Sequence, residues 1–127
     1  MTIGVGVDII TISRMKNILE TDGNNAFLDK VFTSWERQRL ETHPDKVAYA
    51  AMTFAAKEAI FKTFGIGWHF GVKFTEIEVR DGKYGEPEPI LTGRFAELAA
   101  ERGVSRVLLS LSYDGDYAVA VAALSKE

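Results

Sequence analysis

The first apolar segment of the chain alternates between two kinds of residue. Residues 3–10, IGVGVDII, place large aliphatic side chains on one face and Gly4, Gly6 and Asp8 on the other. Alternation with a period of two predicts a β-strand. Glycines within a strand allow another backbone or a ligand to approach closely. We therefore expect such an approach on the face that carries Asp8.

Helical spacing of apolar residues follows this strand. It predicts helices over residues 11–20, 26–32 and 33–43. Thr33 and Glu36 have the spacing of a capping box at the start of the third helix. Pro44 suits the first turn of a longer helix that runs to about Phe64 and stops near Gly65 and Gly67.

The second half of the chain is richer in alternating segments. The pattern predicts a strand over residues 73–81, a turn and loop over 81–89, a helix over 93–103, and a hairpin formed by 105–113 and 116–124. Asp114-Gly115 between the last two segments is a strong hairpin signal. The element order predicts one α+β domain over residues 1–127, with an antiparallel sheet packed on a long central helix.

Composition narrows the classes of function. The absence of cysteine excludes disulfides and thiolate metal sites, and two histidines make the usual zinc site a poor fit. A metal would need carboxylate ligands, which favours Mg²⁺ or Ca²⁺. A net charge of -3 gives no overall field for nucleic acid. With neither a signal pattern nor a membrane-spanning apolar run, we expect a cytoplasmic protein.

The long central helix contains an unusual cluster of charges. Between Val47 and Gly65 the only charged residues are Lys57, Glu58 and Lys62. Glu58 falls in line with an apolar stripe, where a carboxylate is costly unless it is paired or bound to a cation. An exposed i,i+4 ion pair between Glu58 and Lys62 is one explanation.

Asp8 is a second unusual acid, because aspartate is disfavoured inside strands. The strand could simply end and turn at Asp8. Alternatively, Asp8 and Glu58 converge on one divalent cation, which keeps water and substrate phosphate as its other ligands, as Mg²⁺ prefers. Lys62, one helical turn beyond Glu58, would then contact a phosphate oxygen.

Several motifs occur in an order that resembles one enzyme family. These are GVGVDIITISR, KVFTSWE, FAAKEAIFKTFGIG, FTEIEV, YGEP and SLSYD, which together span nearly the whole chain. They resemble the holo-acyl-carrier-protein synthases, which are small 4'-phosphopantetheinyl transferases. The resemblance implies transfer of phosphopantetheine from coenzyme A to a serine of an acyl carrier protein, with release of adenosine 3',5'-bisphosphate. It leaves the base that accepts the serine proton open between Glu58 and a metal-bound water.

The resemblance also implies roles for individual residues. Asp8 and Glu58 fall on the magnesium-binding positions, and Arg14 falls where the family contacts the acidic helix of the carrier protein. Coenzyme A would be bound by Lys62, Thr53, Gly65, Pro87 and Tyr113. Family members of this length form homotrimers with active sites between subunits, so we expect the same assembly here.

Three positions depart from the family pattern. Thr53 stands where an arginine is common, Glu86 replaces a lysine or arginine, and Tyr113 replaces a histidine. These changes remove positive charge near the expected coenzyme A site and predict weaker binding of its 3'-phosphate, unless they are neutral. Other lysines could compensate: Lys57, Lys73 and Lys83.

Two other classes of function fit the bare pattern. A long apolar helix against an antiparallel sheet also describes the hotdog-fold thioesterases, which act on coenzyme A thioesters without a metal. A non-catalytic relative that binds the carrier protein through Arg14 is the second alternative.

Overall fold

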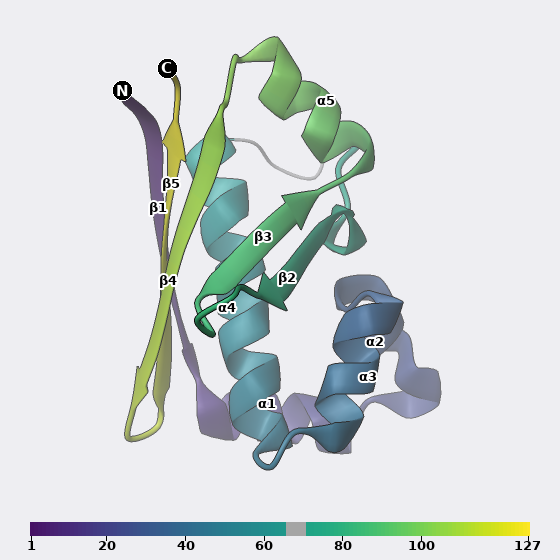
Figure 1. Ribbon diagram of the computed structural model, residues 1–127. Helices are drawn as coiled ribbons and strands as arrows, with labels where there is room; N and C mark the ends of the chain where they lie inside the picture. Colours follow the sequence, from purple (N-terminus) through teal and green to yellow (C-terminus); the bar gives the residue numbers. More distant parts are fainter. Residues whose placement is uncertain (66–70) are drawn as a thin grey trace.

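The structure, a computed structural model, describes residues 1–65 and 71–127 and has the expected α+β architecture (Figure 1). The elements in chain order are β1 (Thr2–Thr11), α1 (Ile12–Glu20), α2 (Ala26–Val31), α3 (Ser34–Thr42), α4 (Lys46–Phe64), β2 (Ile77–Asp81), β3 (Pro87–Leu91), α5 (Gly93–Glu101), β4 (Arg106–Asp114) and β5 (Tyr117–Ser125). Helix α4 lies between a three-stranded sheet and a layer formed by the other helices and the β2–β3 hairpin.

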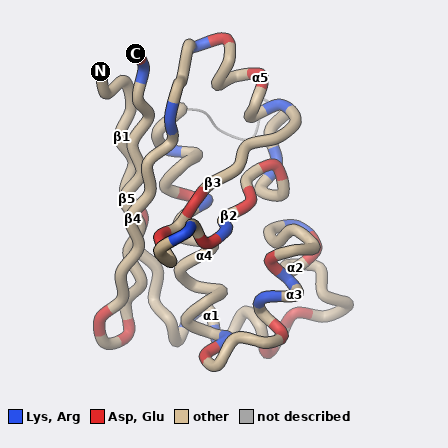
Figure 2. The backbone as a smooth tube through the Cα atoms, in the orientation of Figure 1, with Lys and Arg blue, Asp and Glu red and all other residues tan. Residues whose placement is uncertain are grey.

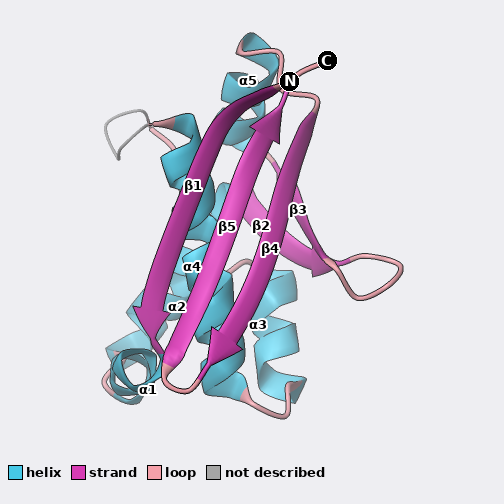
Figure 3. Cartoon of the chain, turned by 90° about the vertical axis from the view of Figure 1, so that its left-hand side faces the viewer, coloured by secondary structure: helices cyan, strands magenta, loops and turns pink. Residues whose placement is uncertain are grey.

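The larger sheet joins the two ends of the chain. Its strand order is β1-β5-β4 and every pair is antiparallel, with Asp8 opposite Ala120. Strand β5 contains no charged residue, and Figure 2 shows that charges on this sheet lie mainly near its ends. Figure 3 shows the sheet face-on, with β1 and β4 at opposite edges.

Small residues let α4 come close to this sheet. Ala118, Ala120 and Ala122 of β5 are buried on the side that packs against the alanine-rich helix. A Cβ atom added to Gly6 would lie 2.1 Å from the carbonyl oxygen of Ala59, closer than real Cβ atoms come. The glycine face of β1 is therefore the face that α4 approaches, and the close approach expected from the sequence is confirmed.

The aliphatic face of β1 points away from the core. Val5, Val7 and Ile9 are 65%, 55% and 61% exposed, and Val121 on β5 and Leu108 on β4 are exposed as well. Exposed apolar side chains thus occur on all three strands, whose outward faces lie next to one another in the sheet. Contiguous apolar surface of this kind marks an interaction site.

Aromatic side chains fill the core on the other side of α4. Phe61 lies with its ring centroid 4.8 Å from that of Phe74 and 4.9 Å from that of Phe95. Rings at these distances and tilts pack favourably beyond the area that they bury. This cluster ties the centre of the molecule to helix α5 and to the turn before β2.

Most helix and strand boundaries agree with the sequence predictions. The capping box forms at Thr33, whose hydroxyl accepts from the Glu36 N–H at 3.2 Å. Helix α4 begins after Asp45, so Pro44 lies just before it, and ends at Gly65 in the left-handed conformation with φ 64°. Gly67, the other predicted stop, lies outside the described residues.

Two predictions about the second half were wrong in detail. Residues Phe74–Glu76 form a 3₁₀ turn and not the start of a strand, because the Glu76 carboxylate accepts N–H groups of Lys73 and Arg94, both at 2.9 Å. Strand β3 was expected to be loop up to residue 89. Its prolines are tolerated because β3 pairs with β2 alone in a two-stranded sheet.

The β4–β5 hairpin forms, but its turn is shifted by one residue. Asp114 pairs with Tyr117, so Gly115 and Asp116 make the turn, and Gly115 adopts φ 58°. Across the described ranges, we find no helix with the length and apolar character needed to cross a membrane.

Candidate functional site

Asp8 projects from β1 towards the last turns of α4. It shares its face of the strand with Gly4 and Gly6, whose close contact with the helix brings this part of β1 against α4. The Asp8 side chain is 17% exposed, which leaves it accessible from solvent at the edge of the sheet. The alternative that the strand ends at Asp8 is wrong, since β1 continues to Thr11.

Lys62 bonds to β1 and not to its own helix. Its Nζ atom donates to Asp8 Oδ1 and to the Val7 carbonyl oxygen, both at 3.0 Å. Glu58 and Lys62, although both described, form no ion pair with each other, so the simple i,i+4 pair is absent. The Lys62 side chain is half exposed and can reach a ligand at the surface.

Glu58 lies close enough to both residues to feel their charges. Burial raises the pKa of the Glu58 carboxyl above its ordinary value, the negative charge of Asp8 raises it further, and Lys62 offsets part of the shift. Both acids and the lysine therefore lie near one another between β1 and α4, and their joint role at a metal stays a prediction. A carboxylate whose negative charge is only partly compensated is stabilised when it binds a proton or a cation.

This pair of acids fits a divalent cation that keeps open positions. Among the described residues, no group of three or more histidine or acidic side chains forms a complete protein cage for a metal. Mg²⁺ commonly binds through one or two carboxylates and keeps waters and substrate phosphates as its remaining ligands. Asp8 and Glu58 match that chemistry, because they supply two carboxylates beside a lysine.

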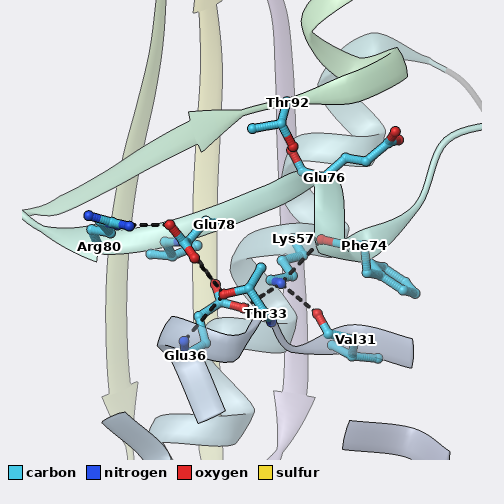
Figure 4. Close-up of polar contacts among 10 residues, drawn as sticks. Val31, Thr33, Glu36, Lys57, Phe74, Glu76, Glu78, Arg80 and Thr92 are labelled. Atoms are coloured by element: carbon cyan, nitrogen blue, oxygen red, sulfur yellow. Dashed lines mark hydrogen bonds and ion pairs between the residues drawn. The ribbon is translucent and has the colours of Figure 1, made fainter. Parts of the chain in front are cut away.

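Lys57, the residue before Glu58, has a different environment (Figure 4). Its ammonium group is fully buried and donates to Glu36 Oε1 at 2.6 Å, to the Val31 carbonyl and to the Phe74 carbonyl at 3.2 Å. The other Glu36 oxygen accepts the Val79 N–H at 2.8 Å. Lys57 therefore cannot compensate for a missing cation at a coenzyme A site, and that idea was wrong.

Thr53 and Pro87 lie in a separate cavity. This cavity has a volume of about 240 Å³ and lies between α3, α4 and the β2–β3 hairpin; its lining includes Trp35, Arg39, His43, Tyr49, Thr53 and Pro87. None of Asp8, Glu58 and Lys62 lines it. No local sequence pattern indicates the contributions of α3, because only the tertiary packing brings these side chains to Thr53.

The remaining candidates lie at the surface. Tyr113 is 58% exposed on β4, at the opposite edge of the sheet from β1, and Gly65 caps the end of α4 (Figure 3). Arg14 is exposed on α1. The start of α1 is held by Asp116, whose carboxylate accepts the Ser13 N–H at 2.9 Å and the Ser13 hydroxyl at 2.6 Å. One chain therefore brings Asp8, Glu58 and Lys62 together, with Gly65 donating its N–H to the Lys62 carbonyl at 3.1 Å, but it leaves Thr53, Pro87 and Tyr113 elsewhere.

Comparison with known proteins places this geometry in context. A sequence model of the family described as the 4'-phosphopantetheinyl transferase superfamily matches residues 4–122. The holo-(acyl-carrier-protein) synthase of Geotalea daltonii is 40% identical over 126 residues, which are 99% of this chain and 100% of that protein.

Solved structures agree with this match. The holo-(acyl-carrier-protein) synthase of Neisseria meningitidis superposes with a TM-score of 0.91 at 32% identity, over 99% of this chain and 100% of that one. The enzyme of Bacillus anthracis, in complex with CoA (3',5'-ADP), superposes with a TM-score of 0.81 at 30% identity, over 100% of this chain and 99% of that one.

Proposed function

This chain belongs to the holo-acyl-carrier-protein synthases of the 4'-phosphopantetheinyl transferase superfamily, and from that premise we propose how its residues carry out the transfer. The enzyme moves 4'-phosphopantetheine from coenzyme A to an acyl carrier protein. In the proposed reaction a serine hydroxyl of the carrier attacks the phosphorus that bears the pantetheine arm, and adenosine 3',5'-bisphosphate leaves. The observation that carries this proposal is the convergence of Asp8, Glu58 and Lys62 between β1 and α4.

Asp8 and Glu58 would hold Mg²⁺. Bound there, the cation would neutralise the diphosphate of coenzyme A and help to orient it for in-line attack. Asp8 suits this role because Lys62 contacts only its Oδ1 atom, which leaves Oδ2 for another ligand. Glu58 suits it because its pKa is raised by burial and by Asp8, and a nearby positive charge relieves both effects.

Lys62 contributes a mobile positive charge. Its side chain is about half exposed, and ion pairs that involve a solvated lysine contribute little stability. The ammonium group can therefore turn to a phosphate oxygen of the donor without a large cost to the fold. There it stabilises negative charge that builds up on the phosphate under attack.

The carrier protein would dock next to this site. Arg14 is only six residues beyond Asp8, is exposed on α1, and has no ion-pair partner within the described part of the chain. A local positive charge is needed because the molecule carries a net charge of -3 and would otherwise repel an acidic partner. The cytoplasmic location expected from the sequence fits such a partner and stays a prediction.

A homotrimer would complete the coenzyme A site. Thr53 and Pro87 line the cavity between α3, α4 and the hairpin, whereas Asp8 belongs to β1, the edge strand opposite β4 in the sheet. In a head-to-tail ring, the β1 edge of one copy meets the β4 edge of the next, where Tyr113 is exposed. The exposed apolar residues of the sheet support this arrangement, because they would be buried among the three copies.

The transfer is tested with an apo carrier protein, coenzyme A and Mg²⁺, by weighing the carrier in a mass spectrometer. We expect the carrier to gain one phosphopantetheine, and both a chelator and Glu58→Ala to prevent the gain. Glu20→Ala, which removes an exposed acid on α1, is the matched control. Full transfer by Glu58→Ala would show that the metal site is elsewhere.

The same assay separates the alternatives. A thioesterase would act with the chelator present and would add nothing to the carrier, and a non-catalytic relative would bind the carrier without changing its mass. The trimer is tested by light scattering, which should give three times the chain mass of 14.1 kDa.

A further inference from the structure

The cavity between α3, α4 and the β2–β3 hairpin combines two kinds of surface. Trp35, Tyr49 and His43 supply aromatic rings, and Arg39 supplies a guanidinium group. Nucleotides have the matching combination, because they join a flat base to anionic phosphates. Arginine binds phosphate through two parallel hydrogen bonds and stacks on aromatic faces.

The positions that depart from the family pattern bring no positive charge to this cavity. Thr53 is a buried hydroxyl in its wall, and Tyr113 is not part of its lining. The Glu86 side chain lines a different groove, between β3 and β4, and its Oε2 atom accepts the Tyr84 N–H at 2.9 Å. Glu86 therefore does not place its negative charge in the cavity, and Arg39 is the cation among the described lining residues.

Arg39 has donor capacity that the protein does not use. Its Nη2 atom donates to Asp81 Oδ2 at 2.6 Å, whereas its Nε–H is buried and has no acceptor. A buried N–H group without an acceptor destabilises the protein. A ligand oxygen that accepts from it therefore removes this cost as it binds. The pair with Asp81 is about half exposed, so its rearrangement around a ligand costs little.

The neighbouring polar groups also act as donors. The Tyr49 hydroxyl is buried without a hydrogen-bond partner, and although Thr53 lies beside it the two groups lack bonding geometry. Burial, with a contribution from Glu36, raises the pKa of Tyr49 to about 12, so the hydroxyl keeps its proton. His43 Nδ1 accepts the Asp45 N–H at 3.0 Å, which leaves Nε2 to carry the proton.

We propose that Arg39 replaces the missing motif cations and binds the 3'-phosphate of coenzyme A in this cavity, so that the enzyme selects 3'-phosphorylated donors. The inference rests on the proposed function, in which coenzyme A is the donor. It also reverses the loss of 3'-phosphate binding expected from Thr53, Glu86 and Tyr113. In this chain the cation would come from α3 and not from α4, the hairpin loop or β4.

Binding of the released nucleotide tests the role of Arg39 without any chemistry. Titration calorimetry would compare adenosine 3',5'-bisphosphate with adenosine 5'-phosphate, which lacks the 3'-phosphate. We expect the full chain to prefer the bisphosphate and Arg39→Gln to weaken its binding about 10- to 100-fold, the usual effect of a lost hydrogen bond to a charged group. Binding of the 5'-phosphate should change little.

Two further variants make the test specific. Arg37→Gln lies on the same helix, removes a guanidinium that pairs with Asp29 outside the cavity, and should leave both affinities unchanged. Asp81→Asn removes the carboxylate that competes for Arg39 and should tighten bisphosphate binding several-fold. The proposal is overturned if Arg39→Gln weakens both nucleotides equally, if Arg37→Gln has the same effect, or if the chain shows no preference for the bisphosphate.

Transfer assays with coenzyme A and with dephospho-coenzyme A separate this inference from the proposed function. If Arg39 binds the 3'-phosphate, Arg39→Gln raises KM for coenzyme A but not for dephospho-coenzyme A, and kcat at saturation stays close to that of the unmodified chain. Equal KM increases for both donors would overturn it. If neither donor modifies the carrier, the proposed function fails, and the nucleotide titrations still decide the role of Arg39.

Discussion

Lys57 and Glu58 are adjacent on α4, yet their surroundings differ in almost every physical respect. Lys57 points into the core, where Glu36 and two carbonyl groups accept its three protons. Glu58 points towards β1, where it is only partly buried and faces the acid Asp8. Two adjacent residues of α4 thus carry one charge whose hydrogen bonds are all satisfied within the protein and one charge that is only partly compensated.

The causes of the pKa shifts oppose one another at Lys57 but largely add up at Glu58. Burial lowers the pKa of Lys57, but the charge of Glu36 and its hydrogen bond oppose that shift. Burial raises the pKa of Glu58, and its nearest acid adds to the shift. A buried charge is therefore not by itself a sign of function. What indicates function is a buried charge whose ionised form is disfavoured further by a neighbouring like charge.

Removing the open charge should have the largest effect on activity and almost none on the fold. In Glu58→Gln we expect transfer to fall by about 1000-fold or more, because a bound cation contributes several kcal/mol to the transition state. The free energy of unfolding, measured in urea, should stay the same or rise, because the raised pKa shows that the fold disfavours the ionised acid. A clear loss of stability would mean that Glu58 is structural.

Removing the satisfied charge should do the opposite. Lys57→Met leaves Glu36 buried without its partner, and we expect the free energy of unfolding to fall by about 3–5 kcal/mol. The loss should be visible as a lower urea midpoint. Because a pair replaced together by apolar residues is often tolerated, Glu36→Leu combined with Lys57→Met should recover part of it. A loss in the double variant as large as the sum of the two single losses would argue against a coupled pair.

The contact between β1 and α4 determines how close Asp8 lies to Glu58. Gly6→Ala would place a Cβ atom 2.1 Å from the Ala59 carbonyl oxygen, so strand and helix must move apart. We expect a loss of stability of about 1–3 kcal/mol from this overpacking, together with weaker activation by Mg²⁺. Gly23→Ala is the control, since its added Cβ atom would meet nothing within 4 Å. Unchanged activation in Gly6→Ala would separate the metal site from this contact.

Sequence reasoning succeeded where one local pattern determines the outcome. The alternation in β1, the capping box at Thr33 and the end of α4 at Gly65 depend on nearby residues, and all three were predicted from the sequence. The convergence of Asp8, Glu58 and Lys62 was also expected. A glycine face on a strand allows a close neighbour, and charges on an apolar helix are costly unless they are paired.

The failures have a common physical cause, which is contact between residues distant in the sequence. Lys57 could not be assigned to the core because its partner Glu36 lies 21 residues earlier, on another helix. The 3₁₀ turn before β2 depends on the Glu76 carboxylate, which reaches the start of α5. Arg39 joins the cavity only through the packing of α3 on α4 and β2.

The smallest expected effect concerns carrier recognition, which should leave both α4 charges undisturbed. Arg14→Ala removes an exposed charge from α1, whose start stays anchored by Asp116. We expect KM for the carrier protein to rise about tenfold with little change in kcat, because charges at an interface mainly affect encounter and specificity. KM for coenzyme A should not change.

Lys16→Ala, which removes another exposed cation of the same helix, should have a weaker effect, because the Lys16 side chain points in a different direction around α1. Equal effects of the two variants would mean that the carrier senses the general charge of α1, whereas a drop in kcat would place Arg14 with Glu58 in the reaction itself.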